Sequence, residues 1–595
     1  MEEADEEYRS IARLSATALQ RADATSVQVR SLTHRNRLGE ALSLGLDSLL
    51  ELGIMVPVVD QLSIELERQF DLLYRWLDQI TAPDDLTRPE VTDPTLLAAT
   101  RVSLAVLPVA YFVADLSMYA WLSLDALRIW LEHGPGRTLI GPACHVAHAA
   151  AELRGDYAAA YEALQRIVAL GEARGYQPEV AQAHFMAAVL SWWYEPIEDV
   201  AHMAQRALEG MIAGGDLATA GYTYYMRGYY LLDCAPSLDS CLAEVSAGLA
   251  FARRTGGEQT GQLLGGYQWL AGVLRGEISA AAGEVVALDT SVYNPLGRFV
   301  ARITRAIAAA IFGDQGELAR HTEAAMPLLP FAAGQYSGAV ARVLRGLALA
   351  TQARAVHGAG RDVLLSELDA VTRWLAGCAT DAPQNFLHLL RLVEAERAWA
   401  VGDFRAAVLA FDAARREVAR QQRPWHRALI NERAARFYLA NGVEHAGFDL
   451  LAQARQQYFA WGATAKVDQL DSAYATVRPE HDAIAEHRGD LPGDLGDGRA
   501  AVTTGSLDLL GILSASQALS SATSVDRLHA RVVEVLGAMT GATGVHLLLW
   551  SDDRQDWLLP APDSGGGTVP IRGTDRERTV PMSVLRYAQR MREPL

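Results

Sequence analysis

The sequence predicts a mostly α-helical protein: an α-solenoid of degenerate tetratricopeptide-like helix hairpins, followed by a small α/β unit. Half of the 595 residues are apolar, and much of the excess is Ala and Leu, which favour helices. A helix-hairpin motif recurs within residues 1–478. After residue 505, short apolar runs separated by turn residues follow two helical segments. Stacked helix pairs can form one continuous solenoid over such a length without dividing into compact domains.

The recurring motif has a Gly or Asn, a large residue two positions on, a small residue at the fifth position and apolar residues at the sixth and ninth. After Gly402 these positions hold Phe404, Ala407, Val408 and Phe411. The same pattern begins at Gly155, and similar patterns with one departure each begin at Asn36 and Gly442. Gly or Asn permits the left-handed turn that ends one helix, and the small residue lets the paired helix approach closely. The pattern is typical of helix-hairpin repeats, although its spacing is irregular.

The chain divides by composition into three parts. Residues 1–478 are expected to form the helical repeats. Residues 479–505 are rich in Gly, Asp and Pro and are expected to be a flexible linker. Residues 506–595 are expected to begin with two helices and continue with strands. These elements are predicted at Ser506–Leu519, Val525–Met539, Val545–Trp550 and Trp557–Leu559, with a third strand near Thr568–Ile571.

Charge and hydropathy exclude several classes of protein. The 53 basic and 71 acidic residues give a net charge of −18, which repels phosphate backbones, so we expect no nucleic-acid binding. The acidic N-terminus is unlike a targeting peptide. The longest apolar run, Leu104–Ala114, is interrupted by Pro108 and is shorter than the ~20 residues that cross a bilayer. We therefore expect a buried helix there, no membrane insertion and a cytoplasmic location.

Few residues could support chemistry. Lysine occurs once, at Lys466, in a segment that matches neither the phosphate loop of ATPases nor the lysine-bearing strand of protein kinases. No nucleophile–base pair or carboxylate cluster of an all-α enzyme is evident, so we expect no catalytic residue and no cofactor. The four cysteines are too few and too scattered for a disulfide framework and are interpreted as small buried hydrophobes. They are Cys144, Cys234, Cys241 and Cys378.

Two clusters are candidates for binding. Cys144, His145 and His148 could be metal ligands, but no second Cys/His pair lies nearby in sequence, so packing is the favoured interpretation and no metal site is expected. Aromatic residues gather between positions 192 and 230. They could anchor a protein partner on a concave solenoid surface, or they could fill gaps between helices. The partner-binding candidates are Trp192, Trp193, Tyr222, Tyr225, Arg227 and Tyr229.

Several stretches, taken in order, resemble a family of large bacterial signalling proteins. Leu38–Ile54, Thr92–Phe112 and Leu127–Gly134 resemble the region that follows the ATPase in these proteins, and Ala446–Tyr474 resembles the end of that region. Leu507–Trp550 resembles the start of a GAF domain. The family combines a serine/threonine kinase, an AAA-type ATPase, a GAF domain and a sensor histidine kinase. The stretch from Val525 to Leu595 is shorter than the roughly 100–150 residues of a typical domain, so a truncated GAF-like unit is expected.

The resemblance implies a non-catalytic sensor or scaffold segment of a signal-transduction protein. Such a segment would bind a protein partner or an effector and couple it to a kinase, and the kinase or ATPase domains are the possible partners. The alternative is the helical-repeat region of an ATPase-type transcription regulator. That class expects a C-terminal DNA-binding helix-turn-helix, whereas residues 506–595 turn to strands. The sequence leaves the ligand and the oligomeric state open.

Overall fold

The computed structural model describes residues 2–35, 37–80, 82–279, 295–474, 549–551, 556–561 and 567–570. The chain forms two compact units, Met1–Arg488 and Gly489–Leu595. The described part of the first unit is almost entirely helical, as predicted. The predicted linker and the two helices predicted within 506–539 lie outside the described residues.

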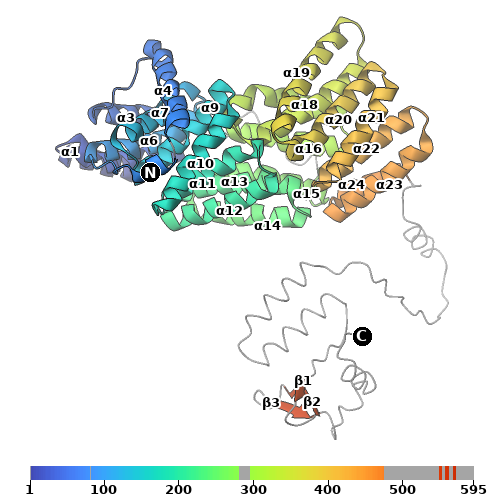
Figure 1. Cartoon of the computed structure of the whole chain (residues 1–595). Helices are drawn as coiled ribbons and strands as arrows, with labels where there is room; N and C mark the ends of the chain where they lie inside the picture. The colour runs from blue at the N-terminus through green and yellow to red at the C-terminus, as the bar shows by residue number, and fades with distance from the viewer. Residues whose placement is uncertain are drawn as a thin grey trace. The chain divides into compact units, whose positions relative to one another are not determined.

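The first group of helices in this unit precedes residue 280 (Figure 1). It comprises α1 (Glu2–Leu14), α2 (Ala18–His34), α3 (Leu38–Glu51), α4 (Val59–Gln79), α5 (Ala82–Thr87), α6 (Pro94–Phe112), α7 (Leu116–His133), η1 (Arg137–Leu139), α8 (Ile140–Cys144), α9 (Val146–Arg154), α10 (Tyr157–Ala173), α11 (Val180–Leu190), η2 (Ser191–Trp193), α12 (Ile197–Gly214), α13 (Leu217–Cys234), α14 (Leu238–Thr255) and α15 (Glu258–Leu274).

The second group follows residue 294 and forms an array in which consecutive helices pack side by side (Figure 1). It comprises α16 (Pro295–Phe312), α17 (Gln315–Ala325), η3 (Met326–Ala332), α18 (Tyr336–Ala355), α19 (Ala359–Asp381), α20 (Pro383–Val401), α21 (Phe404–Val418), α22 (Pro424–Ala440), α23 (Glu444–Trp461) and α24 (Thr464–Ala473).

The helix breaks lie where the glycine motif predicts them. Gly402 has a φ of +81° and ends α20 in the left-handed conformation. The next residue, Asp403, caps α21, because its side chain accepts a hydrogen bond from the Ala406 N–H. The small residue of the motif, Ala407, is fully buried. The break at Gly402 therefore ends one helix, caps the next and lets the pair pack closely, and the break at Gly155 does the same with Asp156 as the cap.

The fifth position of the motif is small because a neighbouring helix lies against it. At Gly447 on α23, an added Cβ would lie 2.6 Å from the Leu439 side chain on α22. Ala41 and Ala160 occupy the same position in two other motifs and are buried. The prediction of close helix approach at these positions is confirmed. Asn36, which begins the first motif, lies outside the described residues.

Helix α6 is the one helix in the described part of the chain that is long and apolar enough to cross a membrane. In its most apolar window, 56% of the residues are buried inside the protein. The buried positions include Val102, Val106 and Val109, and the helix packs against α2, α3 and α7. This is the environment of a core helix, as the sequence predicted for the run from Leu104.

The second group of helices packs back onto the first. Helix α24, the last of the second group, contacts α15 of the first group and also α16, the first helix of its own group. Thr464 Oγ1 donates a hydrogen bond to the Arg275 carbonyl over 2.9 Å, and Gln469 Nε2 donates one to the Phe312 carbonyl over 2.9 Å. A purely linear solenoid would lack such contacts, because each repeat would contact only its neighbours.

A second junction between the groups lies at η2. The buried Asn385 on α20 donates through Nδ2 to the carbonyls of Trp192 (2.8 Å) and Glu195 (2.7 Å). Its Oδ1 accepts a hydrogen bond from the Ile197 N–H (3.1 Å). Trp192 Nε1 donates to the Gly334 carbonyl over 3.0 Å. One asparagine thus satisfies three backbone groups of a segment about 190 positions earlier in the chain.

In the second unit, the described residues form a three-stranded antiparallel sheet in the order β1-β2-β3. The strands are β1 (Leu549–Ser551), β2 (Asp556–Ala561) and β3 (Gly567–Pro570). Trp550 pairs with Trp557, and Leu559 pairs with Val569. The predicted hairpin and third strand are confirmed at these positions. The predicted residues 545–548 and 571 lie outside the described part, and the likeness to a truncated GAF domain stays a prediction.

Candidate effector-binding cavity

A cavity of about 150 Å³ lies inside the helical unit. Its walls come from α2, α6, α7, α9, α11, α13, α15 and α16, together with His145 before α9 and Gln335 before α18. Leu104 and Pro108 of α6 both line the cavity. Because proline has no backbone N–H, the Leu104 carbonyl lacks the helical hydrogen bond that residue 108 would otherwise donate. Because the lining runs from Arg30 to Gln335, the cavity joins segments that are far apart in the sequence.

The inner wall is largely aromatic. Phe112 and Tyr222 face each other with their ring centroids 5.4 Å apart, and Tyr111 and Tyr119 are 6.2 Å apart. Phe185, Met186, Val189 and Met226 add apolar surface from α11 and α13. Such a wall favours flat apolar molecules, with a few polar groups to orient them.

Hydrogen bonds fix the tyrosines that line the cavity. Tyr225 donates its hydroxyl to Gln335 Oε1 (3.0 Å), and Gln335 Nε2 donates to the Tyr111 hydroxyl (2.8 Å). Tyr111 then donates to the Ala333 carbonyl (3.1 Å). On the other side, Tyr222 donates to Gln259 Oε1 over 2.5 Å. Each of these hydroxyls has a partner, so the aromatic wall is held in one arrangement.

Tyr119, His145 and His148 form a buried polar cluster at the wall. The Tyr119 hydroxyl lies 2.5 Å from His145 Nδ1 and 3.1 Å from His148 Nδ1. Burial lowers the pKa of His145 to about 3 and that of His148 to about 4, so both imidazoles are neutral at pH 7. Among the described residues, His148 Nε2 has no hydrogen-bond partner.

Charged groups of the lining lie at the mouth. Arg30 and His34 on α2 are exposed, and Asp216 is half-buried. Asp216 caps α13 by accepting from the Thr219 N–H (3.2 Å), and it also accepts from Gln182 Nε2 (2.5 Å). The remaining lining residues include no Asp, Glu, Lys or Arg. Among the described lining residues, the interior is therefore polar only through hydroxyl, amide and imidazole groups.

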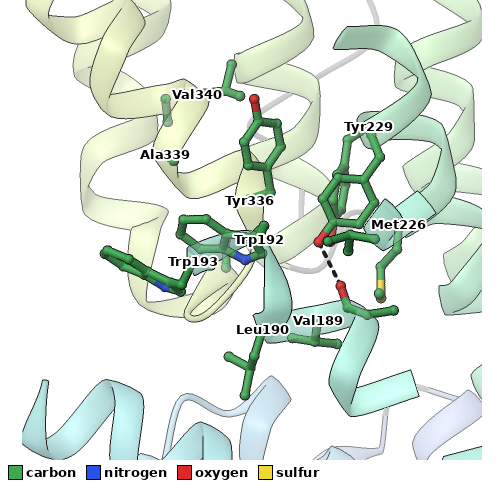
Figure 2. Close-up of a cluster of buried hydrophobic side chains, with 14 of the residues drawn as sticks. Val189, Leu190, Trp192, Trp193, Met226, Tyr229, Tyr336, Ala339 and Val340 are labelled. Carbon is green, nitrogen blue, oxygen red and sulfur yellow. Dashed lines mark hydrogen bonds between the residues drawn. The ribbon is translucent and has the colours of Figure 1, made fainter. Parts of the chain in front are cut away.

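Four of the predicted partner-binding residues are buried, and Figure 2 shows three of them, Trp192, Trp193 and Tyr229. Trp192 and Trp193 stack on each other with ring centroids 4.8 Å apart, and Trp192 meets Tyr336 at 5.8 Å. Tyr229 packs on Tyr225 at 5.2 Å. The chain itself covers these side chains, so the structure favours the alternative in which they fill gaps between helices.

The remaining two candidates are half-buried and have partners. Arg227 donates to Glu244 over 2.5 Å on the neighbouring α14. Tyr222 lines the cavity, as does the buried Tyr225. The structure thus brings two of the six predicted residues to a shared site and leaves Trp192, Trp193, Arg227 and Tyr229 outside its lining. Binding of a protein partner by any of them stays a prediction.

The Cys144-to-His148 segment packs as the favoured interpretation expected. Cys144 is buried and donates to the Gly141 carbonyl. The other three cysteines are also buried and free. No group of three or more His, Cys, Asp or Glu side chains within the described ranges is placed to hold a metal ion. What the sequence interpretation missed is that His145 and His148 line the cavity, beside aromatic residues of α6, α7 and α13.

A separate polar cluster is buried between α13, α18, α20 and α22. Asp233 accepts from the Tyr336 hydroxyl (2.8 Å) and from Trp425 Nε1 (2.7 Å). His426 Nε2 lies 3.5 Å from the same carboxylate, and His426 Nδ1 is 3.0 Å from His388 Nε2. Burial raises the pKa of Asp233 to about 6. This cluster lies outside the cavity lining and joins the two groups of helices.

Comparison of the sequence with models of known protein families finds no match, and comparison with curated proteins finds none either.

Proposed function

We propose that the helical unit is the non-catalytic sensor region of a cytoplasmic signal-transduction protein, and that it binds a small effector in the cavity. The observation that carries this proposal is the origin of the cavity lining, which spans Arg30 to Gln335. A molecule bound there would contact both groups of helices at once. The recurring hairpin motif supports a tetratricopeptide-like solenoid as the scaffold, with an additional closure between its two groups.

Occupancy of the cavity can be coupled to the junction at η2. Gln335 and the Ala333 carbonyl hold Tyr225 and Tyr111 of the cavity wall. The adjacent Gly334 carbonyl accepts from Trp192 Nε1. Residues 333–335 thus connect the cavity wall to the junction at η2. If these residues have two arrangements, an effector that binds one arrangement more tightly shifts the equilibrium toward it. The resemblance to kinase- and ATPase-containing signalling proteins supports such a domain as the recipient. The alternative, an ATPase-type transcription regulator, keeps the same effector site and changes only the output domain.

Thermal denaturation of the full chain tests the proposal. The probes are phenol, indole, benzoate and adenosine, which differ in charge and size. Ala218 is half-buried at the mouth, early in α13, so Ala218→Trp should block entry. Ala406→Trp is the matched control, because Ala406 is half-buried early in α21 and away from the cavity.

At least one probe should raise the melting temperature of the unsubstituted chain and of Ala406→Trp, but not of Ala218→Trp. A ligand at 100 times its Kd adds about 2.7 kcal/mol of stability, which corresponds to a shift of a few degrees or less in a chain of this size. If no probe acts, or if the probes act equally on all three proteins, the effector site is refuted.

A further inference from the structure

We infer that the cavity takes a neutral, hydroxylated aromatic molecule of one or two rings. This inference rests on the proposed function, since it names the ligand class of the same site. Three independent properties of the cavity carry it: its size, the absence of charge from its interior lining, and the hydrogen-bonding capacity of the Tyr119–His145–His148 cluster.

Size sets the number of rings. An engineered protein cavity of about 150 Å³ binds benzene, and this cavity has a similar volume. The mouth between α2, α13 and α15 lets a second ring or a short substituent extend outward. Aromatic side chains such as Phe112, Tyr222 and Phe185 offer ring faces and edges to an aromatic guest.

Charge sets the ionisation state of the ligand. Arg30, His34 and Asp216 lie at the mouth, and Asp216 already accepts hydrogen bonds from Gln182 and Thr219. A carboxylate or an ammonium group placed deeper would lose its hydration without gaining a counter-ion, which is costly. The interior therefore selects against charged molecules.

The polar cluster sets the substituent. Tyr119 has one hydroxyl hydrogen and lies between two neutral imidazoles, so it can donate to only one Nδ1 and must accept from the other. His145 and His148 therefore hold opposite tautomers: one Nε2 carries a hydrogen, and the other is an acceptor. A ligand hydroxyl both donates and accepts, so it suits either arrangement. The tyrosine hydroxyls of the wall already have partners, whereas His148 Nε2 has none within the described part.

Gly334 lets the chain pack closely against His148. It occupies the third position of a turn, with a φ of +71°, and an added Cβ would lie 2.9 Å from His148 Nε2. The Gln335 N–H closes this turn onto the Ala332 carbonyl over 3.1 Å. His148 Nε2 is buried against this turn, so a ligand hydroxyl reaches the nitrogen only when the turn moves.

Isothermal titration calorimetry on the full chain at pH 7 tests the ligand class with phenol, toluene and benzoate. Phenol should bind about five- to tenfold more tightly than toluene, because it gains one net hydrogen bond in a buried site. Benzoate should show no measurable binding. Equal binding of phenol and toluene, tighter binding of benzoate, or no binding of phenol would each overturn the inference.

Two substitutions locate the hydrogen bond. His148→Phe keeps a ring and removes both nitrogens, so the preference for phenol over toluene should fall below about twofold while toluene binding persists. His321→Phe is the matched control, a buried histidine on α17 outside the cavity, and it should leave the preference unchanged. If His148→Phe does not fold, the comparison of phenol with toluene on the unsubstituted chain still tests whether the cavity prefers a hydroxylated ligand.

The two proposals fail in different ways. Stabilisation by benzoate alone, lost in Ala218→Trp, would overturn the ligand class and leave the effector site standing. Failure of all four probes in the thermal experiment would remove both.

Discussion

Lys466 donates a hydrogen bond to Glu432 over 2.8 Å, and both side chains are buried. Glu432 also accepts from Arg436 over 2.5 Å, and Lys466 donates to Gln469 Oε1 over 2.9 Å. Burial lowers the pKa of Lys466, while the adjacent carboxylate opposes that change. The one lysine of the chain is therefore a structural cation that joins α24 to α22.

Replacing this lysine should destabilise the helical unit strongly. Lys466→Met leaves the Glu432 carboxylate without one of its two cations in a buried site, and breaking a buried pair costs about 3–5 kcal/mol. Urea denaturation, followed by circular dichroism, measures the loss. The control is Arg416→Met, which removes an exposed pair with Asp412 and should cost less than about 1 kcal/mol. Similar midpoints for the two variants would contradict a structural role of Lys466.

Asn385 is expected to hold the two groups of helices together at η2. Asn385→Ala leaves two carbonyls and one N–H of residues 192–197 without partners, and each unpaired buried group costs about 1–3 kcal/mol. Hydrogen exchange should therefore accelerate in that segment. Asn441→Ala is the control, because within the described residues the Asn441 side chain bonds only the Phe437 carbonyl of α22, the helix that it ends. Unchanged exchange at residues 192–197 in Asn385→Ala would show that the junction does not depend on this side chain.

Gly334 should tolerate alanine less well than an ordinary helix-ending glycine. Gly334→Ala combines a positive φ with a Cβ 2.9 Å from His148 Nε2, whereas Gly402 has a positive φ and nothing within 4 Å. The strain of the left-handed backbone, about 1–2 kcal/mol, is common to both. The Gly334 variant should lose at least about 1 kcal/mol more, because the imidazole must move. If urea denaturation gives equal losses of unfolding free energy for Gly334→Ala and Gly402→Ala, His148 lies further from the turn than the structure shows.

The stability of the unit should depend on pH through Asp233. Its pKa is about 6 in the folded protein against 3.8 for the free group, because burial outweighs the hydrogen bonds from Tyr336 and Trp425 and the charge of Arg423. The folded state therefore holds this proton more tightly than the unfolded state. The resulting stabilisation, about 2–3 kcal/mol, is complete below about pH 4 and is lost as the pH rises through about 6.

Asp233→Asn should remove this dependence. The difference in unfolding free energy, variant minus unsubstituted chain, should increase by about 2 kcal/mol between pH 4 and pH 7. Asp239→Asn is the control, because it makes the same substitution at an exposed carboxylate on α14. A constant difference for Asp233→Asn would mean that Asp233 is ionised without penalty. Burial, together with the charge of Arg423, lowers the pKa of neighbouring His426 well below its ordinary value of 6.5.

The features that could be predicted from the sequence are local ones. The break at Gly402 and the buried Ala407 lie within six positions of each other, so a short pattern specifies both. The hairpin joining β1 and β2 is equally local. Hydrophobic spacing and turn residues carry enough information for such elements.

The cavity could not be predicted in this way, because its walls depend on pairings between distant segments. Tyr111 and Gln335 are 224 positions apart, and the sequence around each residue does not indicate that the two are in contact. Most of the aromatic residues between positions 192 and 230 are buried or line the cavity. The sequence alone does not distinguish aromatic residues that fill gaps between helices from those that form a binding surface. His145 and His148 were noticed as potential ligands, and only the position of Tyr119 shows their hydrogen-bonding role.

The junction at η2 also constrains how the protein is made. Trp192 lies 142 positions before Gly334, its hydrogen-bond acceptor, and 193 positions before Asn385, which bonds its carbonyl. At a synthesis rate of roughly 5–20 residues per second, the ribosome needs about 10–40 seconds to add the later partner. During that interval, the two adjacent tryptophans lack the segment that covers them. The nascent chain thus exposes a hydrophobic surface of known position and duration, which is where a chaperone would be needed.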